Sequence, residues 1–453
     1  MKTSFKYIVI LAATSALLTV TSCKKTFYTS VNTNPDALVN APLNTILPVV
    51  ETGLAYAQGG NQSLYTSLLM QQTEGITFQA QAYYQYNFTN QDFETQWDEM
   101  YTNAMENDYT LMNLADSKGA NEYSGIARIL MAYSLQTMVD CWGSIPYSKS
   151  FQGSSDLTPT YDNDQTLYAN IGTLISQGIS YLGEAPGGTA PSNDDVIYGG
   201  NAQSWIAFAH AINARVAIHQ SKNNSAMAST ALTEVTNANT NSFATAQVIF
   251  GTTQSNSNPW YQFIQNRVGY VSFAGSTLAT ELSTLNDPRY SAFIDTTGAQ
   301  DNLAAFYGSS NSPVEFITPE ELLFITAEAT VTSSGSVTGA AVTAYDSAIA
   351  VNMEKLGIAH SAIATYISAN PLPTSTTSAA ITQIGLQEWI ALYLNPEEFA
   401  VWRRTGSPTL TPPSGAKYNV VPRRFLYPQS ELSYNGANTP NATLFAPKVF
   451  WDN

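Results

Sequence analysis

The sequence contains very little cysteine and very little charge. Its 453 residues include 2 cysteines, Cys23 and Cys141, so at most one disulfide is possible and a hydrophobic core must provide the stability. Charged residues make up 11% of the chain, and 18 Lys and Arg stand against 34 Asp and Glu, which gives a net charge of −16. This acidic balance argues against nucleic acid or an anionic membrane surface as a partner.

Recognisable catalytic patterns are also missing. His210 and His219 are separated by more than the i, i+4 spacing of a helical zinc site, and His360 lies far along the chain. The sequence holds no Ser nucleophile elbow, no P-loop and no Gly-x-Gly-x-x-Gly. We therefore expect no catalytic residue, no metal site and no cofactor. Two alternatives stay open, because a glycosidase needs only a pair of carboxylates and Asp194-Asp195 offers oxygen ligands for Ca²⁺.

The first residues carry the pattern of an exported lipoprotein. Lys2 and Lys6 precede an apolar stretch, Ile8 to Val20, that is too short to span a bilayer comfortably. Small residues then lead to the cysteine in Val20-Thr21-Ser22-Cys23, a segment that resembles the lipobox of lipoprotein signal peptidase. The alternative is an ordinary cleaved signal followed by an incidental cysteine.

This pattern predicts the organisation of the whole chain. We expect residues 1–22 to be a signal peptide, Cys23 to carry the lipid, residues 23–31 to form a tether and residues 32–453 to form one domain. No later apolar stretch is long enough to cross a membrane, so the lipid is the expected membrane anchor.

Helical periodicity dominates the predicted domain. Apolar residues recur at spacings of three and four through residues 97–115, 123–134, 205–218, 345–353 and 384–394. The clearest helix start is Thr318-Pro319-Glu320-Glu321, with Thr318 as N-cap, Pro319 in the first turn and Glu321 placed to complete a capping box. Helix, short turn and helix form the repeating unit of tetratricopeptide-like arrays.

Strand signals are few and short. We expect strands at residues 247–250, 270–273 and 420–421, and long polar connections at residues 150–165, 183–203, 251–270 and 406–447. No alternation of strands and helices indicates a βαβ fold. The predicted fold class is therefore mostly α, a tetratricopeptide-like scaffold of helical pairs with long loops and a few short strands.

Several short segments, in their order and spacing, carry a resemblance to a known family. They are Asn32-Thr33-Asn34-Pro35, Trp97 with Tyr101 and Asn107, Asp140–Tyr147, Tyr198-Gly199-Gly200 before Trp205 and Phe208, Asp287-Pro288-Arg289, Glu328-Ala329 and Trp402–Pro408. Together they resemble the SusD/RagB family of nutrient-binding outer-membrane lipoproteins, in particular its second SusD-like branch. His210 stands where the family usually has Asn, and Lys24-Lys25 stand where surface lipoproteins often carry acidic residues.

The resemblance implies a function in nutrient uptake. It implies a lipid-anchored protein of the cell surface that captures oligosaccharide and delivers it to a TonB-dependent, SusC-like outer-membrane transporter, without chemistry of its own. The alternatives are a peptide-binding member of the same uptake system and a secreted, lipid-anchored glycan-degrading enzyme. A periplasmic solute-binding lipoprotein would need a two-lobed α/β fold, which the helical periodicity argues against.

The ligand candidates lie in two aromatic-rich polar segments. Tyr83, Tyr84 and Tyr86 are interleaved with Gln and Asn, and Trp260 and Tyr261 follow Asn258-Pro259. Aromatic rings stack on the apolar faces of sugars, while amides bind their hydroxyls. The alternative for residues 83–86 is a strand that packs alternate rings inward.

The most conspicuous motifs are interpreted as scaffold. For Asp140–Tyr147 we expect a helix end in which Asp140 binds backbone amides and Gly143 takes a positive φ, rather than a ligand platform. Arg403 and Arg404 are expected to bind the end of their own helix or to pair with Glu397 and Glu398. Arg215 is expected to be a buried partner in an ion pair.

Overall fold

The computed structural model describes residues 41–185 and 187–453. Residues Leu43–Asn453 form one compact unit. The predicted signal peptide, Cys23, the tether and the segment Asn32–Pro35 lie outside the described residues. Within the described part, no helix combines the length and the apolar character needed to cross a bilayer.

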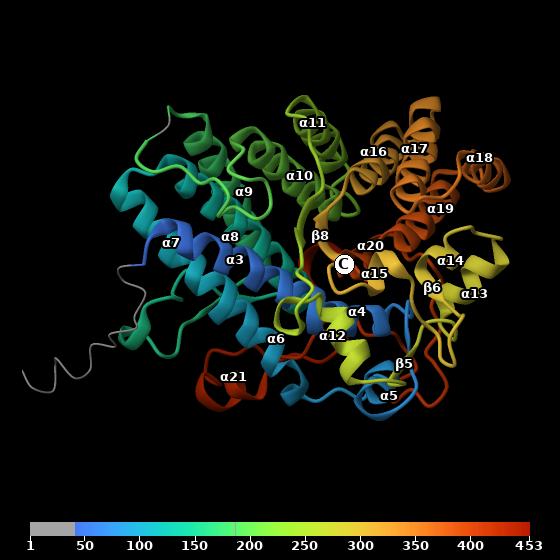
Figure 1. Ribbon diagram of the computed structural model, residues 1–453, viewed down its shortest axis with the longest axis horizontal. Helices are drawn as coiled ribbons and strands as arrows, with labels where there is room; N and C mark the ends of the chain where they lie inside the picture. The colour runs from blue at the N-terminus through green and yellow to red at the C-terminus, as the bar shows by residue number, and fades with distance from the viewer. Residues whose placement is uncertain (1–40, 186) are drawn as a thin grey trace, which may run out of the picture. The chain divides into compact units, whose positions relative to one another are not determined.

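A row of helices forms the framework of the molecule and confirms the predicted fold class (Figure 1). From α7 to α18 each helix of the row packs against the next one, and α19 packs against α16 and α17. The pairs α8 with α9, α10 with α11 and α16 with α17 make the most extensive contacts. The row comprises α7 (Glu106–Lys118), α8 (Asn121–Trp142), α9 (Asp164–Gly183), α10 (Ala202–Gln220), α11 (Ala226–Thr240), α16 (Pro319–Ser334), α17 (Gly339–Lys355), α18 (His360–Ala369) and α19 (Thr377–Ala391).

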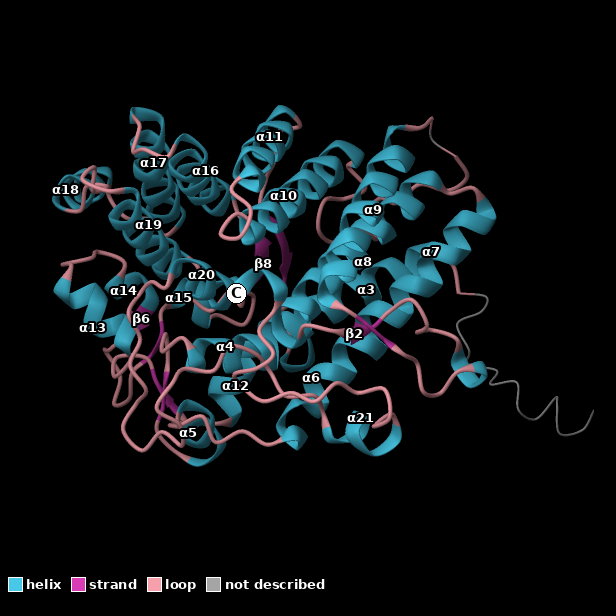
Figure 2. Ribbon diagram, turned by 180° about the vertical axis from the view of Figure 1, so that it is seen from behind, coloured by secondary structure: helices cyan, strands magenta, loops and turns pink. Residues whose placement is uncertain are grey.

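Shorter helices and loops lie along one side of this row, the lower side in both views (Figures 1 and 2). The helices on this side are α4 (Ser63–Leu69), α5 (Phe78–Tyr84), α6 (Glu94–Asp98), α12 (Pro259–Asn266) and α21 (Gln429–Tyr434). The remaining α-helices of the described residues are α3 (Leu43–Ala57), α13 (Thr277–Thr284), α14 (Tyr290–Phe293), α15 (Ala305–Gly308) and α20 (Glu397–Thr405). π-Helical turns, Gln58–Gln62 and Glu99–Met105, join α3 to α4 and α6 to α7.

The start of α16 follows the predicted N-terminal signal only in part. Thr318 is the N-cap, and its Oγ1 accepts a hydrogen bond from the Glu321 amide at 3.3 Å. The predicted capping box is wrong in its second half, because the Glu321 carboxylate binds the buried Arg215 instead. The Glu321 carboxylate therefore pairs with the Arg215 guanidinium and not with the backbone amide of Thr318.

Helices α8 and α9 cross at a point of unusually close approach. A Cβ atom on Gly125 of α8 would lie 2.9 Å from the Gly178 carbonyl oxygen, and one on Gly178 of α9 would lie 3.0 Å from the Gly125 oxygen. Only glycine on both sides permits this backbone contact. It locks the pair, and nearly all of α8 is buried.

The strands form isolated antiparallel pairs, one strand with one other. They are β1 (Glu74–Gly75) with β5 (Val271–Ser272), β2 (Ile145–Pro146) with β3 (Tyr161–Asp162), β4 (Ala246–Ile249) with β8 (Pro313–Ile317), and β6 (Ile294–Asp295) with β7 (Asn302–Leu303). The strands expected at residues 247–250 and 270–273 are present within one or two residues. The strand expected at 420–421 is wrong, because the segment runs without a pairing partner.

The β1–β5 pair positions the candidate ligand segments. Glu74 pairs with Ser272, so the chain that enters α5 runs beside the chain that leaves α12. The predicted polar loops at 251–270 and 406–447 contain α12 and α21, which were not expected. The strand considered for residues 83–86 is also wrong, because Tyr83 and Tyr84 lie in the last turn of α5.

Candidate functional site

Tyr83 of α5 faces residues that follow the start of α12. Together they enclose a cavity of about 250 Å³, the Tyr83 cavity. It is lined by Asn61, Leu64, Tyr65, Gln79, Ala80, Tyr83, Gln91, Asp92, Thr95, Phe263, Arg267 and Tyr270. Tyr83, from the first predicted ligand segment, therefore meets Phe263, Arg267 and Tyr270, which follow the second predicted segment far along the chain.

A second cavity, also of about 250 Å³, lies on the other side of Phe263 and Arg267. This Trp260 cavity is lined by Tyr56, Gly59, Gly60, Asn61, Leu64, Glu99, Pro259, Trp260, Gln262, Phe263, Asn266 and Arg267. The two cavities share Asn61, Leu64, Phe263 and Arg267, so they adjoin. We call them together the α12 cavities.

Asn258 and Pro259 fix the start of α12. The Asn258 side-chain oxygen accepts hydrogen bonds from the amides of Trp260 at 2.8 Å and Tyr261 at 3.3 Å, and Pro259 occupies the first turn. The Trp260 indole N–H donates to Ser63 Oγ at 2.8 Å, and only 5% of this residue is exposed. Trp260 therefore presents a small part of its ring as a fixed wall.

Tyr83 is held as rigidly as Trp260. Its hydroxyl donates to Asp92 Oδ1 at 2.9 Å, and its ring stacks on Phe88 with centroids 4.7 Å apart and planes at 4°. Burial and the Asp92 carboxylate raise the pKa of Tyr83 far above its usual value, so the hydroxyl keeps its proton. The residue is half-buried and lines the cavity.

The exposed aromatic surface belongs to residues that the sequence analysis did not propose. Phe78 is 71% exposed and stacks on Tyr270 with centroids 4.9 Å apart. Phe263 is half-buried and borders both cavities. Tyr270 and Phe263 fall in the loop that the sequence assigned to ligand binding, and an aromatic count over residues 251–270 would have found them.

Other predicted rings take different positions. Tyr86 is fully buried, with its hydroxyl 3.4 Å from Gln71 Nε2, so its ring offers no face to a ligand. Tyr84 and Tyr261 are half-buried and line neither of the α12 cavities. Tyr83 and Tyr84 are adjacent in α5 and only Tyr83 lines a cavity, while Tyr86 lies beyond the end of that helix, so sequence position alone does not separate these rings.

The charges at the α12 cavities are few and mixed. Arg267 is exposed, and its guanidinium carbon lies 5.7 Å from the centroid of the Tyr270 ring. Glu99 lines the Trp260 cavity, and burial, with a smaller effect of Asp98, raises its pKa to about 7. Side-chain amides supply the other polar contacts, so the cavities suit an uncharged ligand with hydroxyl groups and apolar faces.

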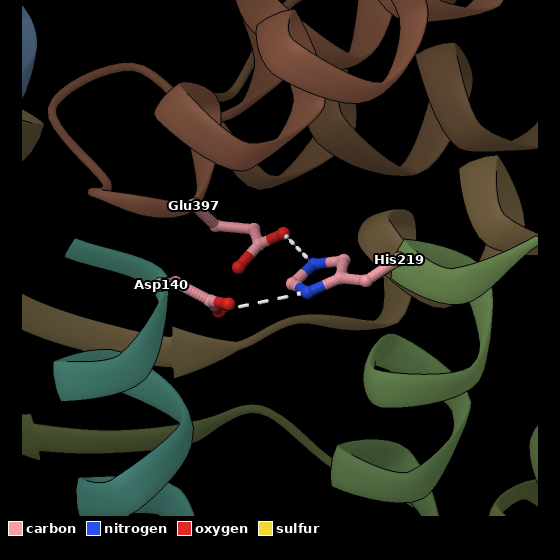
Figure 3. A group of neighbouring side chains, drawn as sticks. All are labelled: Asp140, His219 and Glu397. Atoms are coloured by element: carbon pink, nitrogen blue, oxygen red, sulfur yellow. Dashed lines mark hydrogen bonds and ion pairs between the residues drawn. The ribbon is translucent and has the colours of Figure 1, made fainter. Parts of the chain in front are cut away.

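A second group of side chains, Asp140, His219 and Glu397, lies in the interior (Figure 3). His219 Nε2 is 2.6 Å from Glu397 Oε1, and Nδ1 is 3.5 Å from Asp140 Oδ2. One carboxylate lies beside each of the two ring nitrogens of His219. A metal ion bound to this histidine would need both carboxylates near the same ring nitrogen. Despite the opposing effect of burial, Glu397 and Asp140 raise the pKa of His219 to about 9, so the group is an ion-paired imidazolium.

The comparisons with known proteins bear on the whole chain. Residues 35–428 match the model of the SusD-like_2 family, described as "Starch-binding associating with outer membrane". The chain belongs to this family. No curated protein matches it.

Solved structures of SusD-like proteins share the fold. One is described as a chitin-binding protein, with 20% identity, a TM-score of 0.75, and coverage of 91% of this chain and 100% of the other. A SusD/RagB family protein from Bacteroides thetaiotaomicron has 21% identity, a TM-score of 0.72, and coverage of 91% and 99%. A chitin-binding SusD homolog from Flavobacterium johnsoniae has 20% identity, a TM-score of 0.67, and coverage of 91% and 97%.

Several residues that carry the SusD-like resemblance are buried in ion pairs. Arg404 Nε lies 2.9 Å from Glu328 and its Nη2 lies 3.0 Å from Glu388, so the predicted pairing with Glu398 is wrong. Arg289 pairs with Asp287 at 2.6 Å. The prediction that these motifs are scaffold fits their burial.

The motif Asp140–Tyr147 also lies in the scaffold. Gly143 has the predicted positive φ of 74°, and the Trp142 indole donates to the Leu426 carbonyl at 2.8 Å. The expected contact of Asp140 with backbone amides is wrong, because its Oδ1 accepts from the Tyr168 hydroxyl at 2.5 Å and the Trp451 indole at 3.0 Å.

Arg403 and Arg215 show how far these contacts reach along the chain. Arg403 donates from Nη1 to the Asp140 carbonyl at 2.7 Å, and from Nε to the Phe399 carbonyl of its own helix, so its predicted pairing with Glu397 is wrong. Arg215 is the buried ion-pair partner that the sequence predicted, and it binds Glu321 at 2.6 Å.

The loop Asp194-Asp195 does not present free ligands for Ca²⁺. Asp195 is 3% exposed, and its carboxylate accepts hydrogen bonds from the amides of Ile197, Tyr198 and Gly200 and from the Trp205 indole. The polar connection expected at residues 183–203 thus contains a tightly bonded turn that fixes the start of α10.

Proposed function

We propose that the α12 cavities bind an oligosaccharide at the cell surface, and that the chain delivers it to a TonB-dependent, SusC-like transporter without chemistry of its own. The observation that carries the proposal is the pair of adjoining cavities bordered by Phe263 and Arg267. Aromatic edges and faces there stand beside side-chain amides, the combination that binds the apolar faces and the hydroxyls of sugars.

The family and its structural relatives support this class of ligand. The family is described as starch-binding and associated with the outer membrane, and two similar structures are described as chitin-binding. The rigid hold on Trp260 and Tyr83 also favours binding, because fixed rings lose little conformational entropy when a ligand arrives.

Calorimetric titration of the purified protein with neutral hexasaccharides tests the ligand class. We expect Phe263→Ala to weaken binding of maltohexaose or N-acetylated chitohexaose about tenfold, because one stacked ring contributes roughly 1–1.5 kcal/mol. Tyr290→Ala is the matched control, since Tyr290 is also half-buried but lies on α14 and lines neither cavity. Equal affinity in the two variants would contradict the proposed site, and release of shorter sugars during titration would support an enzyme instead.

The location and the partner need a separate experiment in cells. We expect the protein to be accessible to protease on intact cells, to co-purify with a β-barrel transporter, and to leave the membrane when Cys23 is replaced by Ala. A transporter complex that forms without this chain would contradict the delivery step. A Cys23→Ala protein that stays in the outer-membrane fraction would contradict the lipid anchor.

A further inference from the structure

A larger cavity, of about 570 Å³, lies between the α6–α7 stretch, the loop before β3 and α21. Phe151 stands on its wall, and we call it the Phe151 cavity. It is separate from the α12 cavities, although the same helical stretch borders both. Thr95 and Glu99 face the α12 cavities, whereas Asp98 and Tyr101 line the Phe151 cavity, so the helix divides them.

A row of aromatic rings forms one wall of the Phe151 cavity. The centroids of Trp97 and Tyr101 are 4.9 Å apart, and those of Tyr101 and Phe151 are 6.3 Å apart. Trp97 is 4% exposed and lies at the base, while the other two rings are half-buried. The Tyr101 hydroxyl donates to the Pro146 carbonyl at 2.6 Å, and Phe151 stacks on Tyr109 at 5.1 Å, so the wall is held in place.

The charged side chains of this cavity are all acidic. Asp98, Glu106, Asp156 and Glu431 line it, and no Lys, Arg or His is among the described residues of its lining. Burial raises the pKa of Glu106, and burial with the charges of Glu94 and Glu431 raises that of Asp98. Burial is the main cause of both shifts, and the neighbouring carboxylates add to it only at Asp98.

The carboxylates at the mouth are available to a ligand. Across the described chain, neither Asp98 nor Glu106 makes a side-chain hydrogen bond or an ion pair, and Glu106 is exposed. Glu431 is positioned by the Tyr161 hydroxyl, which donates to its Oε2 at 2.7 Å. A ligand that brings positive charge and hydrogen-bond donors would relieve the repulsion among these groups, whereas an anionic ligand would increase it.

We propose that the Phe151 cavity is a second sugar-binding site, selective for oligosaccharides that carry free ammonium groups. The row of rings suits successive sugar units better than a single cation, and the carboxylates select amino sugars over neutral or acidic ones. The inference rests on the proposed function in one respect, that the ligand is an oligosaccharide. The site and the charge preference that it assigns are different.

The test is a titration of the full protein with three matched hexamers at low and high salt. They are glucosamine hexamer, its N-acetylated form and galacturonate hexamer. We expect Glu106→Gln to weaken binding of the glucosamine hexamer about tenfold, because it removes one charge-assisted contact, and added salt to weaken it further. Phe151→Gly should have a similar effect, and glycine accepts the φ of 62° that Phe151 adopts there.

Controls separate this site from the α12 cavities. Phe263→Ala should weaken the neutral hexamer and leave glucosamine binding at the Phe151 cavity unchanged, whereas Glu106→Gln should do the reverse. Glu354→Gln, a change at an exposed carboxylate on α17, should alter neither. Unfolding temperatures of all variants show whether each one is folded.

Several outcomes overturn the inference. They are wild-type affinity for the glucosamine hexamer in both Glu106→Gln and Phe151→Gly, absence of its binding altogether, or tighter binding of a lysine-rich peptide or of the galacturonate hexamer at this cavity. The proposed function fails on a different result, a neutral hexamer whose binding does not depend on Phe263.

Discussion

The interior of the helical row and the α12 cavities use arginine in opposite ways. Arg404 has a side chain 2% exposed and contacts two carboxylates, Glu328 and Glu388, that are themselves buried. Arg267 is exposed at the junction of two cavities and forms no ion pair among the described residues. The residues that mark the family therefore hold helices together. The ligand site that we propose instead uses side chains around α12 that the family motifs do not include.

Removal of the buried arginine should have the largest effect. Arg404→Met leaves Glu328 and Glu388 without their cation, and we expect the free energy of unfolding to fall by about 3–5 kcal/mol. Arg267→Met removes an exposed cation and should change stability by less than about 0.5 kcal/mol. Urea unfolding of both variants measures the contrast, and equal losses would contradict it.

The buried imidazolium should make stability depend on pH. The folded pKa of His219, about 9, lies above the ordinary value of 6.5, so its contribution is complete below pH 6.5 and is lost as the pH rises through 9. The loss is on the order of 3 kcal/mol. Unfolding curves of the wild type and of His219→Gln across this range measure the loss. Buried acids such as Glu388, whose pKa is also raised, affect both proteins, so their contribution cancels in the difference between the two free energies of unfolding. If the difference in the free energy of unfolding between the two proteins does not change with pH, the His219 ring is neutral in the folded protein.

The smallest expected effect concerns Glu99 at the Trp260 cavity. Its pKa is raised to about 7, so the carboxylate gains charge between about pH 6 and pH 8 and then accepts sugar hydroxyls more strongly. We expect the affinity for a neutral hexasaccharide to rise about threefold over this range. Glu99→Gln should abolish the pH dependence and leave stability nearly unchanged. If the affinity of Glu99→Gln still depends on pH, a titrating group other than Glu99 is responsible.

Local sequence determined much of the framework. The helical periods, the N-cap Thr318 and the turn at Gly143 depend on neighbouring residues, and the structure has them as expected. The segments 83–86 and 258–261 were predicted from their aromatic residues among side-chain amides, and they contribute Tyr83 and Trp260 to adjoining cavities. The class of fold and the two surface segments thus follow from patterns only a few residues long.

Tertiary structure decided which of these side chains are exposed and which are buried. Tyr86 lies in the interior and Phe78 at the surface, although both belong to one short aromatic stretch. Arg215 finds Glu321 across 106 positions of sequence, and this long-range pair takes the carboxylate that a local capping box would have used. Burial and charge pairing depend on the packing of distant helices, so the sequence supplied the residue types and the fold assigned their partners.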